Sequence, residues 1–295
     1  MRVSENMVMQ SFLNNLNSAQ GRLFERNREV ASGKKLNRPS DAPSDSARLV
    51  RLRDEVSRIN QYYRNINHAD LVLGTTENAL NNLNNLITKV HERAAYGVTG
   101  TLNQDDRDAI ATELRSIQDE VVRITATKVS GKYIFSGSAV TTEPLVLNAG
   151  SYDYQGDDRA LEIEVAEGKK IQVNVTGSES FSEPGTDLIN TLTNLIQQLE
   201  SGDPDSARQS MDEIQAAVEM ISKARVRVGT SRQGLDNART TLDKQFVQLT
   251  TAMSELEDAD MAEAISGLVQ AETGLRATLS VGARIGQLNL FDILG

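Results

Sequence analysis

The sequence predicts a mainly α protein: an elongated coiled-coil bundle of long helices formed by the N- and C-terminal segments, with a small β-rich insert. Three observations predict this fold. The five prolines leave residues 45–143 and 205–295 free of proline, which breaks helix interiors. Apolar residues recur at alternating three- and four-residue spacings through both stretches, and the middle of the chain instead alternates apolar and polar residues.

The first long helix is expected to begin after Pro43, with Ser44 or Asp45 as its N-cap, and to end at Gly97 or Gly100. It would hold roughly 50 residues and extend ~75 Å. Its apolar positions are Leu49, Leu52, Val56, Ile59, Tyr63, Ile66, Leu73, Leu80, Leu83, Ile87, Val90 and Ala94. Its outer face is rich in asparagine, a mediocre helix former, so packing must hold this segment.

A second helix is expected to follow Asn103, whose side chain can cap it, with Asp105 and Asp106 in the first turn, where the helix dipole favours acidic groups. Its apolar stripe is Ile110, Leu114, Ile117, Val121 and Ile124.

The next segment is predicted to be a small β domain. Residues 161–165 and 171–175 each alternate apolar and polar side chains, and Gly168 between them indicates a hairpin. Residues 131–185 also hold seven of the twenty glycines and five of the twelve aromatic residues.

Helices resume after Pro184, and Asp203–Pro204 indicates a further helix start, an N-cap followed by proline at the first helical position. From Ala207 to Leu256 fifteen seam positions alternate four and three apart, and twelve are apolar, which is typical of a coiled coil. The three exceptions are Arg225, Arg232 and Arg239. Two interpretations remain open for them: stems on the seam with guanidinium groups in water, or pairing with acidic groups of a neighbouring subunit that sets the register.

The two chain ends carry matching heptad stripes, for which we expect a role in contacts between subunits. Residues 1–44 hold seven Lys or Arg against four acidic residues, whereas residues 255–295 hold two against seven. Opposite charges favour antiparallel pairing, with Lys34, Lys35 and Arg38 near Asp258, Asp260 and Glu263. The expected interface residues are Met9, Phe12, Leu16, Leu23, Val30, Met261, Ile265, Leu268, Leu275, Leu279 and Leu288.

The predicted division is therefore threefold. Residues 1–43 and 257–295 are paired terminal helices, 44–130 and 184–256 are the long-helix bundle, and 131–183 is the β domain. Because the terminal seam contains small residues such as Ala19, Gly33, Gly267 and Gly282, its burial offsets little of the cost of ordering the chain. We predict that both ends are disordered in the isolated monomer and fold when neighbours cover them.

Composition predicts no catalytic, cofactor or metal site. The chain has no cysteine, and its two histidines, His68 and His91, lie more than three helical turns apart. The net charge of −10 argues against nucleic-acid binding. No apolar run reaches the ~20 residues of a membrane span, and the N-terminus does not have the pattern of a cleaved signal peptide. Asn174–Thr176 matches a glycosylation sequon, a common triplet.

Two distant segments resemble the signatures of the bacterial flagellin superfamily: Ala31–Asp41 (ASGKKLNRPSD) near the start and Leu256–Ala262 (LEDADMA) near the end. Three further segments, Lys132–Gly137, Tyr152–Asp157 and Leu290–Leu294, resemble the hook–filament junction branch of that superfamily. Ala42 departs from the pattern, because many relatives carry a second aspartate there.

The resemblance implies a structural subunit of the flagellum that forms a ring of copies between hook and filament. Its implied partners are a hook-side hook-associated protein, flagellin and a cytoplasmic export chaperone on the C-terminal helix, with no nucleic acid and no membrane insertion. It also implies an extracellular location reached by flagellar export without signal cleavage. The alternatives are a minor flagellin and, from another class, a cytoplasmic coiled-coil scaffold.

Overall fold

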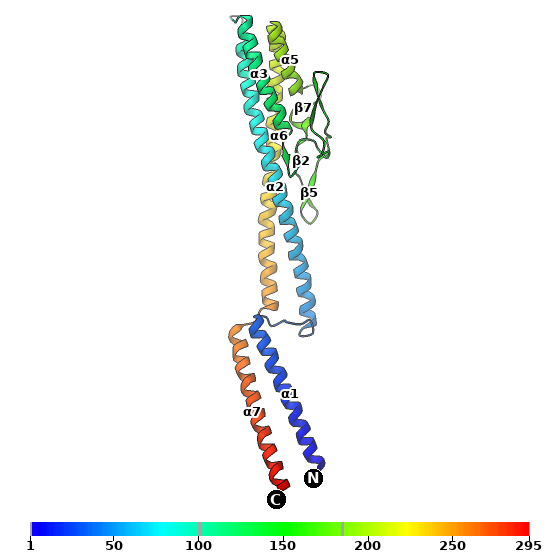
Figure 1. Ribbon diagram of the computed structural model, residues 1–295, viewed down its shortest axis with the longest axis vertical. Helices are drawn as coiled ribbons and strands as arrows, with labels where there is room; N and C mark the ends of the chain where they lie inside the picture. Colours follow the sequence, from blue (N-terminus) through cyan, green and yellow to red (C-terminus); the bar gives the residue numbers. More distant parts are fainter. Residues whose placement is uncertain (1, 100–101, 184–185, 295) are drawn as a thin grey trace. The chain divides into compact units, whose positions relative to one another are not determined.

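The computed structural model describes residues 2–99, 102–183 and 186–294, with the side chains of 2–6, 183, 186 and 285–294 outside the description. The chain is mainly helical, as predicted, and its β strands are confined to an insert (Figure 1). It divides into two compact units, Ile59–Lys244 and the pair of terminal segments Met1–Arg58 and Gln245–Gly295.

Four helices form the frame of the unit Ile59–Lys244. They are α2 (Pro43–Gly97), α3 (Gln104–Thr125), α5 (Leu188–Ser201) and α6 (Pro204–Glu257), of which α2 and α6 continue into the other unit. In Figure 1, α3 runs alongside the upper part of α2. The predicted stripes face inward. The buried residues of this frame include Ile66, Leu73, Leu80, Leu83, Ile87, Leu114, Val121, Leu192, Leu195, Ala207, Ile214, Ile221, Val228, Leu235 and Leu242.

Two helix starts follow the predicted capping residues. The Asn103 side chain accepts a hydrogen bond from the Asp106 backbone N–H at 2.8 Å. Asp203 likewise accepts from the Ser206 N–H at 3.1 Å, and proline follows it at the first helical position. The capping prediction for α2 is wrong: this helix begins at Pro43, so Ser44 and Asp45 lie in its first turn and neither is its N-cap. The helix α2 ends at Gly97, one of the two glycines expected to end it.

The insert consists of four antiparallel two-stranded pairs and one short helix. The strands are β1 (Lys128–Val129), β2 (Lys132–Tyr133), β3 (Leu145–Asn148), β4 (Ser151–Tyr154), β5 (Glu162–Ala166), β6 (Lys169–Gln172), β7 (Ser182–Glu183) and β8 (Thr186–Asp187), and the helix is α4 (Gly177–Ser180). The β5–β6 hairpin turns at Gly168, whose φ of +67° suits glycine, so the predicted hairpin is confirmed. The strands reach slightly beyond 131–183 on both sides.

A small aromatic cluster holds the insert together. The rings of Phe135 and Phe181 meet edge to face with centroids 5.6 Å apart, and Tyr154 contacts Phe181 in the same way. The Tyr154 hydroxyl donates to the Phe135 carbonyl at 2.7 Å and accepts from the Gly177 N–H at 3.1 Å. A Cβ on Gly177 would lie 2.2 Å from the Tyr154 ring, so only glycine fits there.

Two asparagines fasten the insert to the helices. On α5, the Asn190 side chain accepts from the Tyr152 N–H and donates to the Tyr152 carbonyl, both at 2.9 Å, and so occupies the outer edge of β4. On α2, the Asn65 amide donates to the Glu164 carbonyl of β5 at 2.8 Å. Backbone groups of the insert thus hold it against the helices α2 and α5.

We expect Tyr154→Phe to lower the free energy of unfolding by about 1 kcal/mol, because it removes a part-buried hydrogen bond to the Phe135 carbonyl. Burial raises the pKa of Tyr154 to about 12, so the hydroxyl stays protonated throughout the neutral range. Urea unfolding of the full chain measures the change. Tyr96→Phe is the control, since Tyr96 is exposed, and equal effects of the two changes would contradict this role.

Candidate assembly interface

The terminal helices α1 (Arg2–Ser32) and α7 (Met261–Leu294) lie side by side and antiparallel in their unit (Figure 1). Within the described side chains, their contact fully buries only small ones, Ala19 of α1 and Ala264 of α7. The larger side chains along the contact are only half-buried. These are Phe12, Leu16, Leu23, Val30, Leu268 and Leu275.

Glycines on α7 let α1 side chains lie directly on its backbone. A Cβ on Gly282 would lie 2.2 Å from the Phe12 ring, and one on Gly267 would lie 3.2 Å from the Arg26 guanidinium nitrogen Nε. Gly274, between them, has open space around it. The two helices therefore approach closely, but at the cost of apolar side chains that could have filled the seam.

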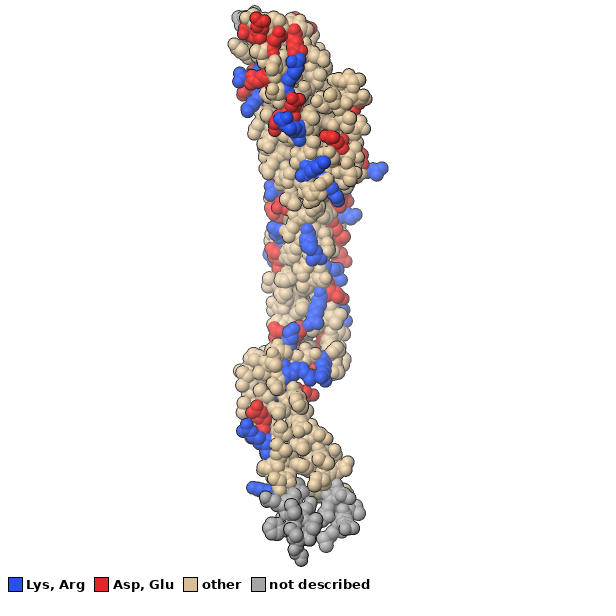
Figure 2. All heavy atoms as spheres, in the orientation of Figure 1, with Lys and Arg blue, Asp and Glu red and all other residues tan. Residues whose placement is uncertain are grey.

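The other predicted interface residues are exposed. Met9, Met261, Ile265 and Leu279 are each 40–49% exposed, and the side chain of Leu288 lies outside the described residues. Periodicity did not single out several further exposed apolar residues. These are Met7, Val8, Leu13, Phe24, Val269 and Val281. Figure 2 shows that uncharged side chains dominate the described part of this helix pair. The pair therefore offers an apolar surface that the described side chains of its own unit leave uncovered.

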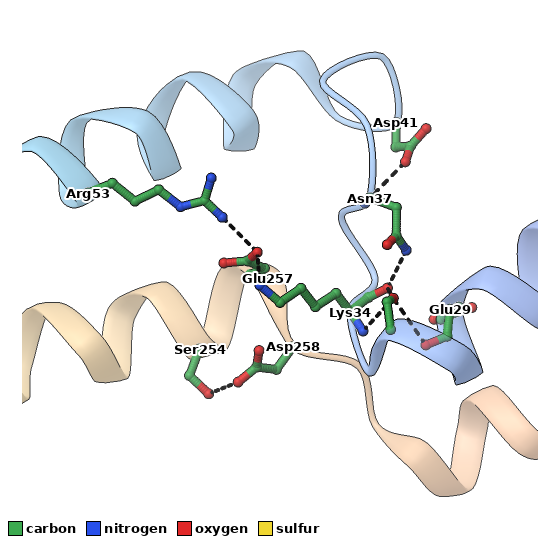
Figure 3. A network of polar contacts seen from close by, with 9 residues as sticks. Glu29, Lys34, Asn37, Asp41, Arg53, Ser254, Glu257 and Asp258 are labelled. Carbon is green, nitrogen blue, oxygen red and sulfur yellow. Dashed lines mark hydrogen bonds and ion pairs between the residues drawn. The ribbon is translucent and has the colours of Figure 1, made fainter.

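Glu257, the last residue of α6, joins three segments of the terminal unit (Figure 3). Its carboxylate oxygen Oε1 accepts from Lys34 Nζ at 2.5 Å and from Arg53 Nη2 at 2.7 Å. Its backbone carbonyl accepts from the Lys35 N–H at 2.8 Å. Burial alone would raise the pKa of Glu257, but the hydrogen bonds from Lys34 and Arg53 outweigh burial, and the pKa is lowered.

The loop 33–42 between α1 and α2 is ordered by its own polar groups. The Asp41 carboxylate accepts from the Arg38 N–H at 2.8 Å, and the Asn37 amide donates to the Lys34 carbonyl at 2.6 Å. Gly33 opens the loop with a φ of +69°, and its carbonyl accepts from the Ala259 N–H. The segment with the N-terminal signature is thus a shaped loop that docks on the end of α6.

The structure changes the expected charge pairing in this region. Lys34 does lie beside Asp258, through a backbone bridge, but its ion pair is with Glu257. The Asp258 carboxylate instead accepts from Ser254 Oγ, and Lys35 Nζ donates to the Glu255 carbonyl. Sequence reasoning missed Glu257 because it lies beside, and not on, the apolar seam. Its place in the second signature was the available signal.

The three seam arginines have different surroundings. Arg232 pairs with Asp70 at 3.2 Å and Glu77 at 2.5 Å, both on α2 of its own chain. Arg239 donates to the Asn67 side chain, also on α2. Arg225 is exposed, with no ion pair or hydrogen bond among the described residues. The acidic partners expected from a neighbour are therefore available to Arg232 within the chain.

Other candidate chemistry is sparse in residues 2–99, 102–183 and 186–294. No group of three or more His, Cys, Asp or Glu side chains in these ranges could hold a metal ion. Asn174 of the sequon is buried; its amide donates to the Arg159 carbonyl and its oxygen accepts from the Leu161 N–H. Glycan attachment would require this side chain to leave its site. No described helix combines the length and apolar character of a membrane span.

Comparison with known proteins places the chain in a family. The model of the bacterial flagellin N-terminal helical region matches residues 3–140, and that of the bacterial flagellin C-terminal helical region matches residues 211–294. The two regions contain the α1–α7 pair, the docking loop, all of α2 and α3, and most of α6. This chain belongs to the bacterial flagellin family.

Within the family, this chain is similar over its full length to flagellar hook-associated protein 3. The proteins of that name from Escherichia coli and Salmonella typhimurium are 23% and 22% identical, each over 99% of both chains. Solved structures share the fold. A flagellar hook-associated protein from Vibrio parahaemolyticus aligns with a TM-score of 0.68, 23% identity, 74% of this chain and all of its own. Hook-associated protein 3 from Legionella pneumophila aligns with a TM-score of 0.65, 16% identity, 70% of this chain and 98% of its own.

We expect Glu257 to titrate below the ordinary glutamate range in the full chain, as measured by carbon-13 NMR of its carboxylate. Its stabilising contribution is complete above the unfolded-state pKa of about 4.3 and is lost as the pH falls through the lower folded-state pKa. Replacing both Lys34 and Arg53 by Gln leaves burial as the main influence, so the pKa should move above the ordinary value. An unchanged pKa in that double variant would contradict the network.

Arg232→Gln should lower the free energy of unfolding by about 0.5–1 kcal/mol, because two half-exposed acidic groups lose their partner. The loss should shrink at high salt, which screens exposed ion pairs. Arg225→Gln, one heptad away and exposed, is the matched control and should change stability by a few tenths of a kcal/mol. Thermal and urea unfolding at low and high salt measure both. A larger loss from Arg225→Gln would show that the intrachain pairs of Arg232 contribute little.

Proposed function

We propose that this chain is a structural subunit of the bacterial flagellum that forms the junction between hook and filament. The observation that carries the proposal is similarity to flagellar hook-associated protein 3 from end to end, including the terminal helices. The geometry supports it, because the terminal pair presents apolar stripes that the described residues of its own unit leave uncovered. A ring of copies, contacting flagellin on one side and a hook-side hook-associated protein on the other, would cover them.

The same proposal includes how the chain reaches its place. We propose export through the flagellar apparatus without signal cleavage, to an extracellular position at the junction. The exposed apolar side chains of α7 would need cover before export, which a cytoplasmic chaperone on that helix would provide. The role is architectural and not catalytic, and the seam arginines retain a proposed contribution to register.

A minor flagellin is the second candidate, because flagellins also match. Escherichia coli flagellin is 28% identical over 60% of this chain but only 34% of its own length. The hook-associated proteins instead match over 99% of both chains, which favours the junction. The two candidates predict different abundance: a junction subunit occurs at a fixed small number per flagellum, whereas a flagellin scales with filament length. A cytoplasmic scaffold would be found only in the cell body.

Hydrogen exchange on the purified full-length monomer and on isolated flagella tests the assembly role. We expect α1 and α7 to exchange freely in the monomer and to become protected on assembly, because the larger apolar side chains of this pair would gain full cover from neighbours. Residues of α3 and α5, whose apolar side chains are buried within their own unit, are the internal control and should be protected in both samples. Terminal segments already protected in the monomer would indicate a closed bundle and favour the cytoplasmic scaffold.

A further inference from the structure

One face of α2 carries no exposed charged side chain over the four turns from Leu71 to Asn85, and the exposed Lys89 follows on the same face. The exposed residues along it are Leu71, Asn78, Asn82 and Asn85, at spacings of seven, four and three that place them on one side of the helix. Within residues 71–88 the single charged residue is Glu77, which is half-buried and paired with Arg232. Leu71 is 55% exposed, so the face also has an uncovered apolar side chain.

The three asparagines of this face have no role within the described chain. Other asparagines do have such a role: Asn65 of α2 and Asn190 of α5 hold the insert, and Asn67 of α2 accepts from Arg239. The side chains of Asn78, Asn82 and Asn85 have no hydrogen-bond partner among the described residues. Asparagine is a poorer helix former than Ala, Lys or Glu. Three asparagines in eight residues therefore weaken α2, and no hydrogen bond of their side chains within the described residues offsets this loss.

An ordinary solvated helix face would carry charges instead. Exposed faces of amphipathic helices usually hold Lys, Arg, Asp and Glu, which keep the surface soluble. Two copies of this chain each carry a net charge of −10, and a contact through a charge-free face places no like charges opposite one another. A carboxamide both donates and accepts hydrogen bonds, so a row of carboxamides can bind donors as well as acceptors on another polar surface.

We propose that the Asn78–Asn82–Asn85 face of α2 is a contact with a second copy of this chain in the assembled junction, with Leu71 at its edge. This inference rests on the proposed function and specifies which part of the long-helix bundle touches the neighbouring copy. The charge-free face lets two like-charged chains approach, and the amides supply hydrogen bonds that are completed only when the neighbour is present. The contact lies on α2 and is separate from the apolar stripes of α1 and α7.

Alanine at all three positions separates this contact from a structural role. In the full-length chain, Asn78→Ala, Asn82→Ala and Asn85→Ala together should leave the melting temperature of the monomer equal or higher, because alanine favours the helix. The amount of this variant recovered in isolated flagella should nevertheless fall several-fold relative to wild type. Recovery equal to wild type would overturn the proposal.

A single added charge gives a second, independent test. Asn82→Asp should also reduce recovery in flagella, because the neighbour would meet an extra negative charge. Asn194→Asp is the matched control: Asn194 is an exposed asparagine on α5, away from this face, and the change should leave recovery unaltered. Equal recovery of the two aspartate variants would overturn the proposal. Failure of the proposed function is distinguishable, since wild-type chain would then itself be missing from isolated flagella.

The identity of the neighbour is tested by cross-linking, which the absence of cysteine makes simple. Asn82→Cys, labelled with a maleimide–benzophenone reagent and incorporated into flagella alongside wild-type chain, should give a cross-linked pair of this protein on illumination. Mass spectrometry identifies the product. A product with a different flagellar protein, or labelled chain in flagella without any cross-link, would overturn the assignment to a second copy.

Discussion

The contact of α2 with α6 is the constraint on which the unit Ile59–Lys244 depends. A single amphipathic helix of this length cannot bury its apolar stripe alone, so α2 is stable because α6 supplies the complementary stripe. Val228, Leu235 and Leu242 are buried at one-heptad spacing along this contact. α3 and α5 then add to one part of the same core, and the insert attaches to helices that are already fixed in position.

The terminal pair is built on the opposite principle. Its seam uses alanine and glycine, which permit a close approach but bury little apolar area, and its larger side chains remain half-buried or exposed. Burial is the main favourable contribution to folding, so such a pair gains little from its own contact. The polar contacts at Glu257 compensate in part, because they fix where the chain enters and leaves the pair. The unit Ile59–Lys244 thus buries large apolar side chains of its own, whereas the terminal pair fully buries only small ones among its described side chains.

Much of this fold could be predicted from the sequence, because the signals were local. Proline-free stretches gave α2 and α6, Asn103 and Asp203 gave helix starts, and Gly168 gave the hairpin. The missed features depend on tertiary contacts. Glu257 became important only when Lys34 and Arg53, more than two hundred residues earlier, converged on it. Within the predicted interface stripe, Leu16 is half-buried and Met9 is exposed. This difference depends on where α7 lies against α1, which the periodicity of the sequence does not predict.

The two connections to the terminal pair differ in length, with a mechanical consequence. Residues 258–260 join α6 to α7, whereas residues 33–42 join α2 to α1. At about 3.5 Å per residue, the first can extend only ~10 Å and the second ~35 Å. Under tension along the chain axis the short connection becomes taut first, so α7 carries the load. The longer loop can extend only after its hydrogen bonds and its contacts with Glu257 break, so the α1 side of the pair would yield in two stages.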